Sequence, residues 1–137
     1  MANIDLDTAQ RIIEGARAKS SQLNANFCIA VVDPRGDLIA MIREDKSPWR
    51  SVFICQGKAV ASAAWMRPSS ELAAIPEPIH QGLMTMLGGR MIPGQGALPV
   101  FNDGEIIGAV GVSGGPPAED EQVALAGITS VGFQTSP

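Results

Sequence analysis

The sequence predicts an α+β fold in which an antiparallel sheet is flanked by helices. Two pairs of short apolar runs are each joined by a tight turn, and helical patterns stand before, between and after these pairs. Hairpins require antiparallel pairing, and this order of elements differs from the regular strand–helix alternation of a parallel sheet. With no linker and no internal repeat beyond the two hairpins, residues 1–137 are expected to form one domain.

The first expected element is a helix that begins near Asp7. Asp7 followed three residues later by Gln10 matches a capping box, in which each side chain binds a free backbone N–H of the first turn. Apolar residues then recur at helical spacing: Ala9, Ile12, Ile13 and Ala16. This stripe is expected to face a sheet.

The first hairpin is expected from strands at residues 27–32 and 38–43, joined by the turn Asp33-Pro34-Arg35-Gly36-Asp37. Both strands are nearly continuously apolar, so both are expected at the centre of the sheet with both faces covered. The charged residues at and after the turns are expected in solvent: Asp33, Asp37, Arg43, Glu44 and Asp45.

The middle of the chain predicts one helix followed by an irregular segment. A helix is expected over residues 51–65, and small residues in its middle allow close approach either to a sheet or helix or to another subunit. Pro68 ends it. Residues 67–97 contain further prolines around an apolar segment at 79–87 and are expected to be irregular. Long irregular stretches in compact domains are often functional.

A second hairpin and a helix complete the fold. Apolar runs at 97–101 and 106–113 flank Asn102-Asp103-Gly104, which supplies the positive φ angles of a tight reversal. Gly114-Gly115-Pro116-Pro117 then leads into a helix with an acidic first turn. Because acidic residues there repel a phosphate, a structural turn is favoured over an anion site.

Composition excludes several classes of function. Ten Lys and Arg against 14 Asp and Glu give a net charge of −4, which argues against a nucleic-acid surface. No apolar run approaches a membrane span, and the N-terminus lacks the pattern of a signal peptide, so a cytoplasmic location is expected. Cys28 and Cys55 are not spaced as a metal pair and are expected to be buried small hydrophobes.

His80 is the first candidate functional residue, because it is the only histidine. It is interpreted either as a haem axial ligand or acid–base residue, or as a partly exposed loop histidine. A single histidine excludes a multi-histidine metal site within one chain, and no metal site is expected.

Four further residues are candidates for the same site. Met86 and Met91, which cluster with Met66 and Met84, are interpreted as a haem ligand or a soft wall for a flat apolar ligand, or as core fillers. Lys58 is interpreted in two ways. It either reaches over a pocket, where it would bind a carboxylate or act as a base, or it extends to solvent. Arg90 follows two glycines and suits carboxylate recognition, unless it is a surface arginine.

Several segments resemble the GlcG/HbpS-like family, which includes the C-terminal domain of PduO-type cobalamin adenosyltransferases. They are Val31–Ala40, Lys58–Ala63, Gly94 with Leu98-Pro99-Val100, Asp103-Gly104, Ile107–Gly114 and Asp120-Glu121. The resemblance covers almost the whole chain in the expected order. It implies a profilin-like antiparallel sheet, assemblies larger than a monomer, haem or corrinoid-type ligands in some members, and genes in catabolic operons in others.

Together these patterns favour a small-molecule-binding protein of a bacterial catabolic or haem- or corrinoid-related system. Its ligand is expected to be planar and to carry carboxylates, with haem or another tetrapyrrole as the candidate cofactor, in a methionine-lined cleft with His80, Lys58 and Arg90. The alternative is a cofactor-free isomerase, tautomerase or hydrolase acting on a small catabolic acid or an aromatic-derived metabolite. His80 or Lys58 would then transfer a proton while Arg90 holds a carboxylate. A third interpretation is an oligomeric structural or regulatory domain.

Overall fold

Four antiparallel strands in the order β2-β1-β4-β3 form the central sheet of the structure, a computed structural model that describes residues 1–137. The strands are β1 (Cys28–Val32), β2 (Leu38–Arg43), β3 (Ala97–Asn102) and β4 (Glu105–Ser113). Within the hairpins, β1 pairs with β2 and β3 pairs with β4. The pairing of β1 with β4 joins the two hairpins. The predicted α+β fold, an antiparallel sheet flanked by helices in a single domain, is confirmed.

The two strands of the first hairpin differ in burial. Every residue of β1 is buried, because this strand has a neighbour on each side and helices on both faces. No residue of β2 is buried, and Leu38 is exposed, because β2 lies at the edge of the sheet and fewer helical residues pack on it than on the other edge strand, β3. The expectation that both strands are central is therefore wrong for β2.

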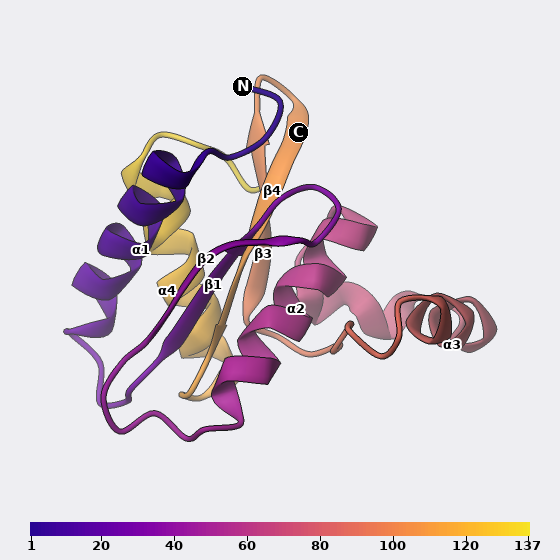
Figure 1. Cartoon of the computed structure of the whole chain (residues 1–137), viewed down its shortest axis with the longest axis horizontal. Coiled ribbons are helices and arrows are strands. Elements are labelled where there is room, and N and C mark those ends of the chain that lie inside the picture. Colours follow the sequence, from indigo (N-terminus) through magenta and orange to yellow (C-terminus); the bar gives the residue numbers. More distant parts are fainter.

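Helices cover both faces of the sheet (Figure 1). On one face, α1 (Leu6–Ser20) and α4 (Pro117–Ser130) pack beside each other and enclose the largest core cluster with residues such as Ile29, Val31 and Val112. On the other face, α2 (Ser51–Trp65) packs against β1 and β4. No helix of the structure combines the length and the apolar character that crossing a membrane requires.

The small residues of α2 allow it to lie directly on the sheet. Ala59 and Ala63 are buried against Val32 and Ala109. Opposite α2, a Cβ atom added at Gly111 would overlap the backbone carbonyl of Cys55. The alanine-rich stretch is thus explained by packing within the chain.

The N-cap of the first helix lies two residues before the predicted cap. Asp5 is the N-cap, and its carboxylate accepts a hydrogen bond from the backbone N–H of Thr8 at 2.8 Å. Asp7 lies inside the first turn, so the predicted capping box is wrong. An aspartate two residues away satisfies the same free donors, and the sequence pattern did not distinguish the two.

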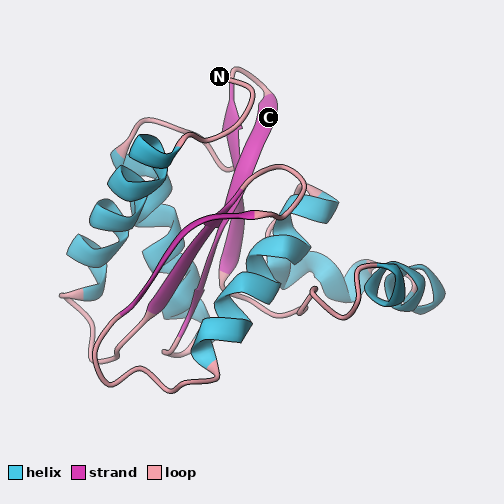
Figure 2. Cartoon of the chain, viewed as in Figure 1, coloured by secondary structure: helices cyan, strands magenta, loops and turns pink.

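The segment predicted to be irregular contains two helices, the 3₁₀ helix η1 (Ser69–Ala74) and α3 (Glu77–Met86). Pro78 stands in the first turn of α3, where the missing N–H of proline has no helical partner to lose. The prolines that were interpreted as interrupting regular structure therefore stand at the starts of helices. Figures 1 and 2 show α3 projecting from the body of the molecule on the side of α2.

Candidate functional site

The side chain of His80 lies at the wall of a cavity of about 420 Å³. His80 is 6% exposed, and its ring nitrogens are not among the buried polar atoms that lack a partner, which are Ser47 Oγ and Trp65 Nε1. The cavity lies between η1, α3 and the segment before β3. Its lining consists of Ser69, Ser70, Leu72, Ala73, Ile75, Glu77, His80, Gln81, Met84, Pro93 and Gly94.

The neighbours of His80 in this cavity are apolar or already hydrogen-bonded. Met84 lies one helical turn further along α3. Ser69 exchanges hydrogen bonds with the backbone of Ala97, and the Gln81 amide donates to Glu77 at 2.8 Å. The imidazole makes no hydrogen bond within the chain, and its ring nitrogens remain in contact with the open space around it.

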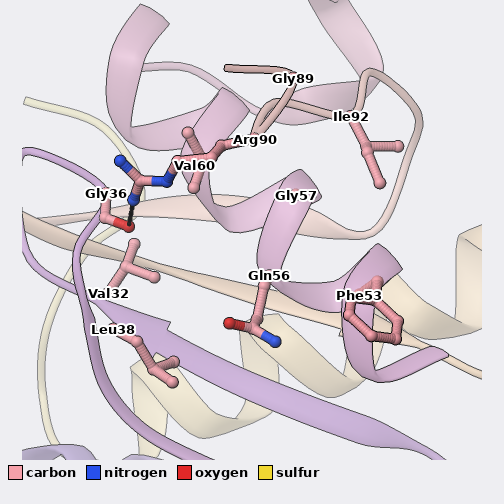
Figure 3. A pocket seen from close by; sticks show the side chains of 10 residues that line it. All are labelled: Val32, Gly36, Leu38, Phe53, Gln56, Gly57, Val60, Gly89, Arg90 and Ile92. Carbon is pink, nitrogen blue, oxygen red and sulfur yellow. Dashed lines mark hydrogen bonds between the residues drawn. The ribbon is translucent and has the colours of Figure 1, made fainter. Parts of the chain in front are cut away.

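Arg90 lines a second cavity, of about 220 Å³, between the turn after β1, α2 and the segment that follows α3 (Figure 3). Its Nη2 donates to the carbonyl of Gly36 at 2.9 Å and lies 3.4 Å from a carboxylate oxygen of Asp37. The amide of Gln56 also faces this cavity.

Lys58 lies in neither cavity. Its ammonium is buried, 3.2 Å from the carboxylate of Asp120 on α4, and donates to the carbonyl of Val112. Asp120 also accepts from the backbone N–H of Gly115 at 3.0 Å. Burial raises the pKa of Asp120, and the hydrogen bond from Gly115 and the charge of Lys58 act in the opposite direction. The charge of Lys58 is balanced inside the fold.

The two candidate methionines have opposite surroundings. Met86 is 88% exposed at the end of α3. Met91 is buried in a small core cluster with Val60, Ala61 and Leu72. Within one chain, the predicted residues do not line a single cleft, and the proton-transfer and carboxylate-binding groups of the cofactor-free enzyme stand apart.

Both cysteines are free and buried, as expected. Burial raises the pKa of the Cys28 thiol and raises that of Cys55 to about 12. Because the thiolate is the nucleophile, neither side chain is activated for chemistry at neutral pH.

Glu44 corrects an expectation about the turns. It was expected in solvent, but its carboxylate accepts from the backbone N–H of Phe27 and the hydroxyl of Ser20, each at 2.8 Å. It also lies 3.5 Å from Arg17. Glu44 therefore links α1 to the start of β1.

The sequence interpretation missed Gln56 and the role of Asp120. Asp120 was taken as one of several acidic residues that complement a helix terminus, and nothing local marks it as the partner of a lysine 62 positions away. Met84 belonged to the methionines interpreted as a soft wall, and its spacing of four residues from His80 places both on one face of α3. Gln56 had no such signal.

Comparison with known proteins gives the same family from sequence and fold. Residues 4–129 match the family described as "Haem degrading protein HbpS-like". Protein GlcG of Escherichia coli K12 is 35% identical over 106 residues, which are 77% of each chain.

Two solved structures share the fold. The crystal structure of a PduOC:haem complex has a TM-score of 0.87 at 23% identity, covering 98% of this chain and 99% of that one. A double mutant of HbpS from Streptomyces reticuli has a TM-score of 0.81 at 26% identity, covering 96% of this chain and 89% of that one. The chain belongs to the HbpS-like family, which also includes GlcG.

Proposed function

We propose that the protein binds a tetrapyrrole such as haem in the cavity between η1 and α3, where His80 would hold the iron. The observation that carries this proposal is an imidazole that lines a cavity and makes no hydrogen bond within the chain, so its nitrogens are open to a ligand there. Histidine is a common axial ligand of haem iron, and an imidazole without a protein partner is free to bind iron.

The lining of the cavity suits one face of a planar apolar ligand. Its volume of about 420 Å³ lies within the range typical of small-molecule sites, roughly 300–1,000 Å³. Leu72, Ile75 and Met84 provide an apolar wall beside His80. No basic side chain lines this cavity and Glu77 is acidic, so the chain offers no partner here for the carboxylates of the ligand. Bound haem would supply an iron centre; the chain would supply the imidazole and the apolar contact.

The comparisons support a ligand of this class. The family description names a haem-degrading protein, and the structure of PduOC is that of a complex with haem. Both statements concern those relatives, and for this chain they make haem the first ligand to test.

Assembly of several copies is a second part of the proposal. The projecting helix α3 carries Ile79 and Met86, which are 59% and 88% exposed, and apolar side chains at such positions are suited to contact another copy. A cytoplasmic location and a role in a catabolic system stay predictions.

A haemin titration followed by absorbance tests the proposal. The wild-type protein is expected to give a saturable shift of the Soret band, and His80→Ala is expected to lose it or weaken it strongly. Thr85→Ala is the matched control, because Thr85 is exposed on the same helix and lies outside the cavity. An unchanged titration of His80→Ala would remove His80 from this role, and non-saturable binding by the wild type would reject the tetrapyrrole site.

A further inference from the structure

We propose that the cavity beside Arg90 is a separate binding site for a compact carboxylic acid with an apolar body. This cavity shares no lining residue with the cavity beside His80. Its walls are mainly apolar, and two polar side chains stand at its edge, Arg90 and Gln56 (Figure 3). Pockets that bind small molecules commonly combine apolar walls with a few placed polar groups.

The apolar walls set the size of the ligand. They are formed by Val32, Leu38, Phe53, Val60 and Ile92. The cavity of about 220 Å³ is much smaller than a tetrapyrrole site requires. A dry apolar cavity of about 150 Å³ already holds benzene, so one ring or a short branched chain fits here together with a carboxylate.

The backbone before Arg90 positions its guanidinium at the cavity. Gly88 and Gly89 have φ angles of +67° and +77°, and a Cβ atom at either would meet no other atom. These glycines therefore serve the turn of the chain, and packing does not require them. The turn brings Arg90 against Gly36, where the hydrogen bond of 2.9 Å holds it.

Arg90 retains donors for a ligand. Its Nη2 is the atom that contacts Gly36 and Asp37, which leaves the N–H groups of Nε and Nη1 without a protein partner. The Nε–H and Nη1–H groups point to different sides of the guanidinium, so each can donate singly to a carboxylate oxygen. Asp37 is a weak competitor, because its carboxylate is 60% exposed and lies 3.4 Å from Arg90.

Gln56 adds a preference within this ligand class. Its amide nitrogen donates to the carbonyl of Val52 at 2.8 Å, which fixes the amide, while the amide oxygen has no partner. Figure 3 shows this oxygen on the side of the amide that faces Val32 and Leu38. A hydroxyl on the body of the ligand can donate to it, so hydroxylated acids are expected to bind more tightly than their unsubstituted forms.

Titration of the ¹⁵N-labelled protein by NMR tests the site with defined probes. Benzoate, 3-hydroxybenzoate and 4-hydroxybenzoate present a carboxylate on a ring, and benzyl alcohol is the neutral control. The two acids that carry a hydroxyl test the role of Gln56. Shifts are expected around Gly36, Gln56 and Arg90, with benzoate binding more tightly than benzyl alcohol.

Variants separate recognition of the carboxylate from packing. Arg90→Gln is expected to weaken benzoate binding on the order of ten- to a hundredfold, as for loss of hydrogen bonds to a charged group. Asp37→Asn removes the competitor and is expected to strengthen binding by about two- to fivefold. Arg67→Gln is the matched control, since Arg67 is exposed and lines no cavity, and it is expected to change nothing.

Three results would overturn the proposal: no saturable shift at this cavity, equal affinity for benzyl alcohol, or an Arg90→Gln variant that binds benzoate like the wild type. Melting temperatures of the variants establish that they fold. His80→Ala is expected to leave benzoate binding unchanged, and Arg90→Gln to leave the haemin titration unchanged, so the two sites can fail independently.

Discussion

Lys58 and His80 are both buried side chains that can carry a charge, and they lie in opposite surroundings. Lys58 reaches from α2 to Asp120 on α4 and to the carbonyl of Val112, so its donors have partners inside the fold. His80 lies on the projecting helix α3, at the wall of a cavity, and its imidazole has no partner. The comparison separates polar groups that hold the fold together from a polar group that is free to bind.

Lys58 and His80 also lie in differently packed parts of the fold. The pair of Lys58 and Asp120 connects helices from the two sides of the sheet. In contrast, His80 stands on a helix that the rest of the chain contacts sparsely. Binding elements are commonly drawn from the less stable parts of a fold, so this contrast leads to predictions about stability as well as function.

The largest expected effect is on the buried ion pair. Lys58→Met leaves the Asp120 carboxylate buried without its cation, and Asp120→Leu leaves the ammonium of Lys58 without its anion. Either change is expected to lower the free energy of unfolding by about 3–5 kcal/mol, which urea denaturation measures.

The double variant provides the control for this pair. Lys58→Met with Asp120→Leu replaces both charges with apolar groups and is expected to recover much of the lost stability. If the double variant is as unstable as the sum of the single variants, the two side chains act independently. That result would place Lys58 outside the class of residues that hold the fold together.

Hydrogen exchange measures the same contrast without substitution. Amides in the middle of α2 are expected to exchange only through global unfolding, because this helix is packed on β1 and β4. Amides of α3 are expected to exchange much faster, through local opening. Equal protection of the two helices would contradict the assignment of α3 to a less stable part of the fold.

If the protein assembles through α3, its amides provide a further measurement. Their protection is then expected to rise with protein concentration, because a contact between copies covers the helix. Ile79→Ser is expected to abolish this dependence. Thr85→Ser on the same helix is the control.

Asp5 provides the smallest effect, since this residue is paired but exposed. The hydrogen bonds from Thr8 hold the pKa of Asp5 below its usual value. A lowered pKa in the folded state means that the ionised carboxylate stabilises the fold above its unfolded pKa, and this contribution disappears as pH falls through the folded value.

Asp5→Ala is therefore expected to lower the melting temperature at pH 7 and to have little effect near pH 2. Asp7→Ala is the control, because Asp7 lies inside the first turn and is not the cap. Equal decreases for both variants at pH 7 would contradict the assignment of the cap to Asp5.

The sheet could be predicted because its signals are local. The turns at 33–37 and 102–104 set both hairpins, and a continuous apolar run marks β1 as buried. The position of β2 at the edge depends on which hairpin strands meet, and that pairing joins residues about 80 positions apart, such as Cys28 and Ser113. Local patterns carry no information about that choice.

The candidate site could be predicted only in part. The single histidine could be singled out from the sequence. Its position in the wall of a cavity could not be predicted without α3, and the prolines at 76 and 78 obscured that helix. Lys58 was singled out because a long cation among small residues needs a reason. That reason is Asp120, a residue distant in sequence whose role depends on the packing of α4 beside the sheet.

Chemical rescue tests most directly the claim that the free imidazole of His80 is a ligand. His80→Gly is expected to lose the Soret shift on addition of haemin, and added imidazole is expected to restore a stoichiometric shift by occupying the vacated space. Restoration would establish that the imidazole itself makes the bond. A His80→Gly variant that binds haemin like the wild type would contradict the account, as would a lost shift that imidazole fails to restore in a variant that still folds.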